Sequence, residues 1–119
     1  MATKKMMQGD SYPIPFTITL NGTTNITPDM ISELELCVGS EDEPAIRKTF
    51  GGGTVWYDTV EEKWFFRPSQ QETLDMEPGV YEVIVRLKFG SGSDSYVIGV
   101  KIGKIIIYDT QSEESARGR

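Results

Sequence analysis

Apolar and polar residues alternate along much of this 119-residue chain and predict a series of short β-strands. The clearest run starts at Tyr81, where every second residue up to Phe89 is apolar and the residues between include Glu82, Arg86 and Lys88. A period of two places the apolar side chains on one face of a strand. No long helical period occurs anywhere. The pattern therefore predicts an all-β fold, an antiparallel immunoglobulin-like β-sandwich of about seven strands with one or two short helical turns; a small barrel is the competing architecture.

Residues that favour turns separate the expected strands. Asn21-Gly22 predicts a tight turn, and Thr27-Pro28-Asp29 predicts one short helical turn. Pro13 and Pro15 confine the first strand to the edge of a sheet, because proline cannot donate to a neighbouring strand. The expected strands span residues 11–20, 31–38, 45–50, 54–58, 63–67, 81–89 and 95–108.

The segment between the fifth and sixth expected strands predicts a corner. Ser69 and Glu72 have the spacing of a capping box, in which each side chain satisfies the backbone N–H of the other residue. Pro78-Gly79 then predicts a turn into the long strand that begins near Tyr81. A corner of this kind connects two strands of a sandwich.

An aromatic hairpin is expected around the loop Thr59–Glu62. If this loop closes the hairpin, Asp58 faces Lys63 and Trp56 faces Phe65. Trp56 and Phe65 then share one side. They either cover a sheet edge under a loop or form an exposed aromatic patch for a protein partner or a sugar ring. A protein partner is favoured, because the nearby polar residues show no arrangement for sugar hydroxyls. The other side of the hairpin holds Val55, Tyr57, Trp64 and Phe66.

The last expected strand changes character at Gly103, which predicts a bulge or bend. Residues 104–108 are apolar on both faces and would be an aggregation hazard if left open. We expect the N-terminal arm or a neighbouring subunit to cover them, so Ile105 and Ile107 join Trp56 and Phe65 as candidate partner-binding residues. If a neighbouring subunit covers them, the protein is a homo-oligomer.

The chain is expected to form one domain with a polar segment at each end. Residues 1–9 are interpreted as a flexible arm, residues 10–108 as the single domain, and residues 109–119 as a disordered tail. The sequence has no transmembrane run and no apolar segment typical of a signal peptide. The lone Cys37 cannot form an internal disulfide, which agrees with synthesis in a reducing cytoplasm.

The amino-acid composition excludes several kinds of partner and functional site. The net charge of −6 and the absence of a basic stripe argue against a nucleic-acid partner. With no histidine and one cysteine, histidine-based catalytic sets and thiolate zinc sites are excluded. The acidic groups at residues 41–43 and 58–62 lack the ligand spacing of a calcium loop and are interpreted as solvated turns. We therefore expect no catalytic, cofactor or metal residues and no enzymatic activity.

Several short motifs together resemble a known family. They occur in the order Gln8-Gly9-Asp10-Ser11-Tyr12, Ile14-Pro15-Phe16, Asn21-Gly22, Ile26-Thr27, Glu33-Leu34-Glu35-Leu36, Ser69-Gln70-Gln71-Glu72-Thr73 and Pro78-Gly79-Val80-Tyr81. Over residues 8–108 the chain resembles small tail-associated proteins of bacteriophages and prophages, and is similar to the immunoglobulin-like N-terminal domain of phage baseplate upper proteins. Those baseplate proteins continue into longer helical or receptor-binding regions, whereas this chain has only a short tail after the last expected strand.

The resemblance implies a non-enzymatic virion component of a phage tail or baseplate, made in the bacterial cytoplasm and bound to other virion proteins. It implies no membrane partner, no cofactor and no catalytic residues. The alternative function is a carbohydrate-binding module or a capsid decoration protein that contacts glycans on the host surface. A sugar site predicts an exposed, coplanar aromatic platform, whereas a docking role predicts an apolar patch next to an unpaired strand edge.

Overall fold

The computed structural model describes residues 3–20, 22, 24–39 and 43–109. Strands make up most of this part, so the predicted all-β class is confirmed. The helical elements are short, as expected: η1 (Pro28–Met30), α1 (Gln70–Asp75) and η2 (Gly92–Asp94). The strands are β1 (Thr3–Met7), β2 (Ile14–Phe16), β3 (Thr19–Leu20), β4 (Thr24–Asn25), β5 (Glu33–Gly39), β6 (Pro44–Thr49), β7 (Val55–Asp58), β8 (Lys63–Phe66), β9 (Gly79–Phe89) and β10 (Tyr96–Tyr108).

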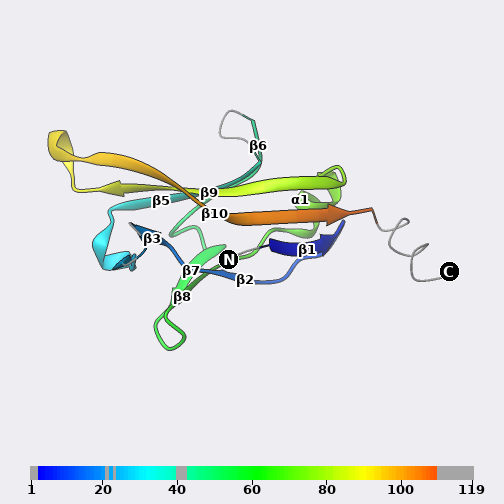
Figure 1. The fold of residues 1–119 in the computed structure, drawn as a ribbon, viewed down its shortest axis with the longest axis horizontal. Helices are drawn as coiled ribbons and strands as arrows, with labels where there is room; N and C mark the ends of the chain where they lie inside the picture. Colours follow the sequence, from blue (N-terminus) through cyan, green and yellow to red (C-terminus); the bar gives the residue numbers. More distant parts are fainter. Residues whose placement is uncertain (1–2, 21, 23, 40–42, 110–119) are drawn as a thin grey trace.

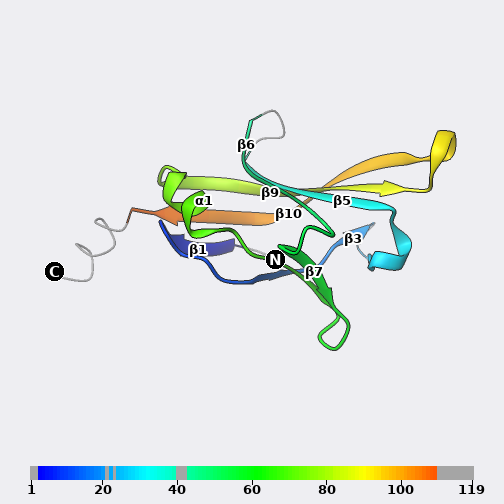
Figure 2. The same cartoon turned by 180° about the vertical axis from the view of Figure 1, so that it is seen from behind.

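Two main sheets and one ribbon organise these strands (Figures 1 and 2). The larger sheet has the order β1-β10-β9-β5-β6, the smaller sheet has the order β2-β8-β7, and β3 pairs with β4. The prolines predicted an edge position for the first expected strand, and β2 does lie at the edge of the smaller sheet. The described residues form more strands than the seven expected, because the first expected strand is divided into β2 and β3, and because β1 and β4 were not expected.

The N-terminal residues correct the sequence interpretation. Thr3–Met7 were expected within a flexible arm, yet they form β1 and pair with Lys104–Tyr108 of β10 in parallel. The fold is therefore not purely antiparallel. Covering of residues 104–108 by the N-terminal arm, one of the two alternatives, is confirmed for the described chain. The lysines of β1 explain the error, since Lys4 and Lys5 make the segment look polar and solvated.

A small network holds β1 in place. The Asp10 carboxylate accepts from the Met7 N–H at 2.9 Å, and the Thr73 hydroxyl donates to the Asp10 carbonyl at 2.8 Å. The same hydroxyl accepts from the Gly9 N–H at 3.0 Å. Gly9 has a φ of 90°, a conformation that favours glycine. Thr73 is fully buried with its hydroxyl bonded, so the end of β1 is fixed to the corner helix.

The corner has the predicted capping box. The Glu72 N–H donates to the Ser69 hydroxyl at 3.1 Å, and the Ser69 N–H donates to the Glu72 carboxylate at 2.7 Å. The same carboxylate forms an ion pair with the ammonium group of Lys48 on β6 at 2.8 Å, and the Lys48 side chain is almost buried. The cap therefore also ties the edge strand β6 to α1.

The predicted irregularity in the last strand is a β-bulge. Lys101 pairs with Ile84 and Gly103 pairs with Val83, so Ile102 is the extra residue. Before the bulge even-numbered residues of β10 face the core, and after it odd-numbered residues do. Ile105 and Ile107 are consequently buried.

The core lies between the two main sheets and is closed by aromatic rings. Trp64 stands near its centre with 1% of its surface exposed, and its indole N–H donates to the Ile26 carbonyl at 2.8 Å. Its ring meets Phe16, Phe50 and Tyr57 at centroid distances of 6.2, 5.1 and 5.2 Å. The larger sheet contributes aliphatic side chains to this core: Leu34, Leu36, Val38, Val83, Val85, Leu87, Ile102, Ile105 and Ile107.

Truncation of Ile105 tests the packing after the bulge. We expect Ile105→Ala to lower the free energy of unfolding by roughly 2–5 kcal/mol, because it leaves a cavity in the core. Ile106→Ala is the matched control, since Ile106 lies on the opposite face of the same strand and is only partly buried. Urea unfolding of both variants measures the difference. Equal losses would contradict the assigned faces.

The corner carboxylate predicts a pH dependence. Partial burial raises the pKa of Glu72, but the hydrogen bonds and charge of Lys48 and Ser69 lower it by more, so that its pKa lies below the usual value. A carboxyl with a lowered pKa stabilises the fold above its unfolded pKa and loses that contribution as pH falls through its folded pKa. We expect Glu72→Gln to flatten this acid decline in stability. Urea unfolding across the acid range measures it, and an unchanged decline would contradict the assignment.

Candidate functional site

The aromatic hairpin has the register that the sequence predicted. Asp58 pairs with Lys63, and Trp56 pairs with Phe65. Val55, Trp64 and Phe66 are buried on the inner side, as expected, and Tyr57 is partly buried there. Trp56 and Phe65 lie on the outer side of the smaller sheet and stay partly exposed.

Trp56, Phe65 and Pro15 form one row across that outer side, which we call the aromatic face. Pro15 of β2 is the strand partner of Phe65, and Phe65 is the partner of Trp56. The rings of Trp56 and Phe65 stack with centroids 5.7 Å apart and planes 11° from parallel. Because the three residues come from three adjacent strands, the sheet itself fixes their spacing.

The loop of the hairpin is ordered by its own side chains. One Asp58 carboxylate oxygen accepts from the N–H groups of Val60 and Glu61, at 2.8 and 3.0 Å. Glu62 adopts a left-handed φ of 57° to complete the turn. These bonds hold β7 and β8 in register and so pre-organise the aromatic face.

The geometry bears on the choice between a protein and a sugar partner. A sugar platform presents open ring faces side by side, whereas Trp56 and Phe65 each turn one face toward the other ring. Trp56 also lies on β7, the end strand of the smaller sheet among the described residues. An apolar row beside a sheet edge is the arrangement expected of protein docking.

The two other candidate partner residues have a different role. Ile105 and Ile107 are buried in the core, with exposures of 1% and 2%, and β1 covers the edge of their strand. The prediction that they bind a partner is therefore wrong for this fold. Their apolar character serves intramolecular packing.

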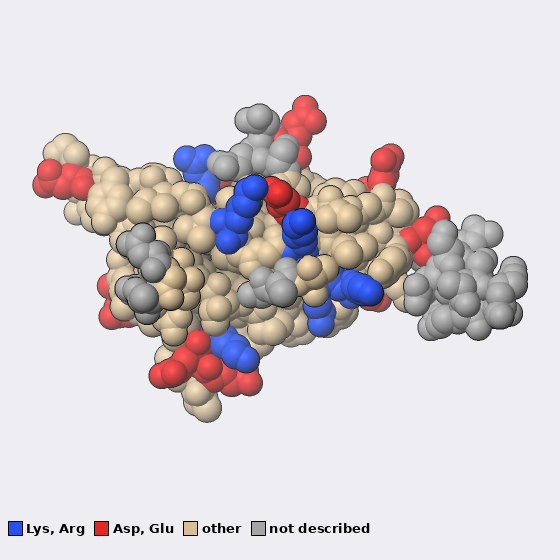
Figure 3. Space-filling model, viewed as in Figure 1, with Lys and Arg blue, Asp and Glu red and all other residues tan. Residues whose placement is uncertain are grey.

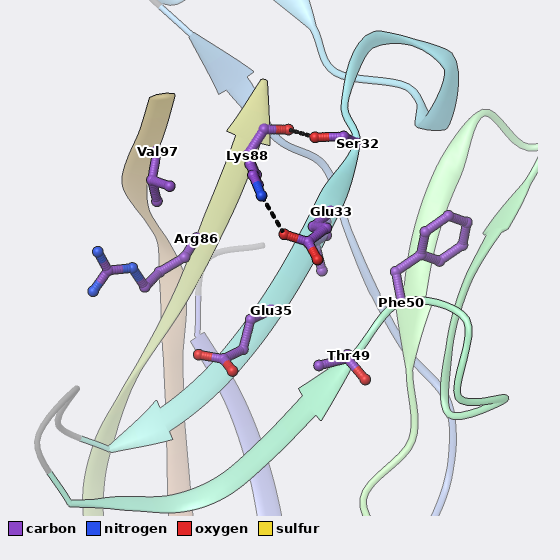
Figure 4. A pocket seen from close by; sticks show the side chains of 9 residues that line it. Ser32, Glu33, Glu35, Thr49, Phe50, Arg86, Lys88 and Val97 are labelled. Atoms are coloured by element: carbon purple, nitrogen blue, oxygen red, sulfur yellow. Dashed lines mark hydrogen bonds and ion pairs between the residues drawn. The ribbon is translucent and has the colours of Figure 1, made fainter. Parts of the chain in front are cut away.

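A second surface feature was not predicted from the sequence. A pocket of about 490 Å³ lies on the outer face of the larger sheet, between Phe50 on one side and Val97 on the other (Figure 4). Its floor carries the ion pair of Glu33 with Lys88, at 3.4 Å, and the Ser32 hydroxyl donates to the Lys88 carbonyl at 3.1 Å. Glu33 and Lys88 therefore neutralise one another on this floor, and Glu35 and Arg86 also line the pocket. The walls come from separate strands, so no local motif signals it.

Cysteine and metal chemistry receive no support in the described residues. Burial, together with the nearby Glu35 carboxylate, raises the pKa of Cys37, which keeps the thiol protonated near neutral pH. In residues 3–20, 22, 24–39 and 43–109 no group of three Cys, Asp or Glu side chains is placed to hold a metal ion. The acidic residues 41 and 42 lie outside the described residues.

Comparisons with protein families and with curated proteins identified no relative of this chain. A scan against protein-family models found no match, and a search among curated proteins found none either. None of the helices in the described part of the chain has the length and apolarity needed to cross a membrane. The site therefore has to be interpreted from its own residues.

Tryptophan fluorescence tests the two ring environments. Trp56 is partly exposed and Trp64 is buried, so we expect iodide to quench only the emission from Trp56. In Trp56→Phe the remaining emission should be nearly insensitive to iodide. Strong quenching in this variant would show that Trp64 is accessible and would contradict the described core.

Proposed function

We propose that this protein is a non-enzymatic structural component of a bacteriophage virion that docks onto another virion protein through its aromatic face. The observation that carries the proposal is the stacked pair of Trp56 and Phe65, held partly exposed beside an edge strand. A tail or baseplate location is the more specific form of the proposal.

Aromatic side chains give such a surface its binding energy. Burial of a large ring removes much apolar area from water, and truncation of a central interface tryptophan commonly costs about 2 kcal/mol or more of binding free energy. Here the rings are already ordered by stacking and by the sheet, so little conformational entropy is lost on binding. The aromatic face thus has the composition and the rigidity of an interface centre.

The phage proposal is supported by the resemblance of short motifs, and two of these motifs, the one with Gly9 and the one with Thr73, contact each other. Gln8 donates from its side-chain amide to the Met76 carbonyl at 2.8 Å, and Gly9 donates to Thr73. The Tyr81 hydroxyl donates to the Glu77 carbonyl at 2.5 Å. The entry segment and the corner therefore form one contact cluster, as residues of a shared structural unit would. An immunoglobulin-like topology of the two packed sheets belongs to the same proposal.

Incorporation into particles tests the docking role. We expect a tagged wild-type chain, expressed during phage production, to co-purify with virions on a density gradient. Trp56→Ala and Phe65→Ala should each lower its amount in virions by at least about tenfold, the equivalent of 1.4 kcal/mol. Val60→Ala is the matched control, since Val60 lies in the same hairpin loop, is 90% exposed and is outside the aromatic face.

Circular dichroism and urea unfolding confirm that each variant is folded before incorporation is compared. Absence of the wild-type chain from virions would contradict the phage role. Full incorporation of both folded aromatic variants would contradict docking through the aromatic face. Binding of a host glycan by the wild type, lost in Trp56→Ala, would favour the carbohydrate alternative.

A further inference from the structure

The hairpin formed by β9 and β10 carries a strand edge that no described strand covers. β1 pairs with β10 only along Lys104–Tyr108, and β9 occupies the other side of β10. The edge over Tyr96–Lys101, which we call the open edge, therefore has no neighbour among the described residues. In Figures 1 and 2 this end of the hairpin projects beyond the rest of the fold.

The open edge is apolar on both faces. Tyr96 and Val97 expose 57% and 51% of their surface, although they point to opposite faces of the strand. Ile98 and Val100 are only partly buried. Exposed edges with apolar side chains are templates for pairing with another strand. The first six residues of β10 have this character, and their single lysine, Lys101, lies at the end of the segment.

The hydrogen bonds of the larger sheet show which backbone groups face outward. The Phe50 N–H donates to the Leu34 carbonyl at 3.0 Å, so Leu34 is bonded toward β6 and not toward β9. Leu34 lies opposite Leu87. Because the backbone N–H and C=O groups of Leu34 point away from β9, those of Leu87 point away from β5 and toward β10. Its partner Ile98 therefore bonds β9. By the same alternation, the N–H and C=O groups of Val97, Gly99 and Lys101 point to the open edge.

We propose that the open edge pairs antiparallel with the open edge of a second copy of this chain. In the register that we infer, Ile98 lies opposite Ile98 of the second copy, and Val97 lies opposite Gly99 of the second copy. Val97 and Gly99 would then exchange two backbone hydrogen bonds, twice in the symmetric pair. This joins the two larger sheets into one continuous sheet.

Steric fit favours this register. A Cβ atom added at Gly99 would meet nothing within 4 Å, so there is open space above this residue. Val97 of the second copy would fill that space. On the other face Tyr96 would cover Val100 of the second copy, and the two Ile98 side chains would meet. Apolar groups thus meet apolar or small groups at every position from 96 to 100.

Charge favours a second copy over other occupants. Asp94 lies at the tip of the hairpin in η2, and Lys101, which pairs with Glu82 at 3.3 Å, lies at the other end of the open edge. Antiparallel pairing reverses one strand, so Asp94 of the second copy approaches Lys101. Figure 3 shows an acidic group at the projecting tip and basic side chains over the middle of the molecule. Residues 110–119 follow the opposite end of β10 and contain no large apolar side chain, which argues against this segment as the occupant.

A proline substitution tests the pairing without removing an interior bond. The Val97 N–H points to the open edge, so Val97→Pro should leave the β9–β10 bonds intact, as prolines at sheet edges do. Val97→Thr is the matched control, because threonine keeps the N–H and the branched shape. Light scattering and sedimentation over a concentration series should show a wild-type dimer, a similar dimer for Val97→Thr, and a dissociation constant raised at least about tenfold for Val97→Pro.

Amide hydrogen exchange on the wild type provides an independent measurement. The N–H groups of Val97 and Gly99 should gain protection as protein concentration rises, whereas the N–H groups of Ile98 and Val100 should be protected at all concentrations. A wild type that stays monomeric at high concentration would overturn the proposal, and so would a dimer in which Val97 and Gly99 remain unprotected. A dimer that survives Val97→Pro unchanged would also overturn it. None of these outcomes depends on the aromatic face or on a phage partner.

Discussion

The bulge at Ile102 is the constraint on which the rest of the fold depends. β10 is the longest strand and is the only one that pairs with both β1 and β9 among the described residues. Without the extra residue, Ile105 and Ile107 would turn outward and Lys104 and Ile106 would turn into the core. The bulge lets one continuous strand change the set of side chains that it buries. The open edge and the part of β10 that pairs with β1 thus belong to one strand, but the first turns even-numbered residues to the core and the second odd-numbered residues.

Successive side chains of the aromatic hairpin point to opposite faces, so some of its rings stabilise the core and others lie on the surface, where a partner can bind. Trp64 and Phe66 close the core, and the buried indole N–H of Trp64 is satisfied by a backbone carbonyl. Trp56 and Phe65, one residue away along each strand, stack outside. A one-residue shift in the pairing of β7 with β8 would exchange these roles. The Asp58–Lys63 pair and the hydrogen bonds of the loop therefore fix both the aromatic face and the core. Fold and candidate site therefore depend on one register.

Much of this arrangement was predictable, because local chemistry determines it. The hairpin register follows from the turn and the charged pair, and the capping box follows from the Ser69 and Glu72 spacing. β1 was missed, because its partner is about 100 residues away along the chain and its lysines mask a single buried side chain, Met6. Ile105 and Ile107 were assigned to a partner for the same reason. The pocket beside Glu33 was also missed, since its walls meet only after the strands assemble.

The pairing of β1 with β10 has a consequence for the order of folding. The first described strand along the chain pairs with the last one, and this parallel register requires a long loop to close. During synthesis β1 must wait without its sheet partner while β5, β6 and β9 assemble. Completion of the larger sheet therefore requires β10, and Lys4 and Lys5 keep the β1 segment polar while it is unpaired.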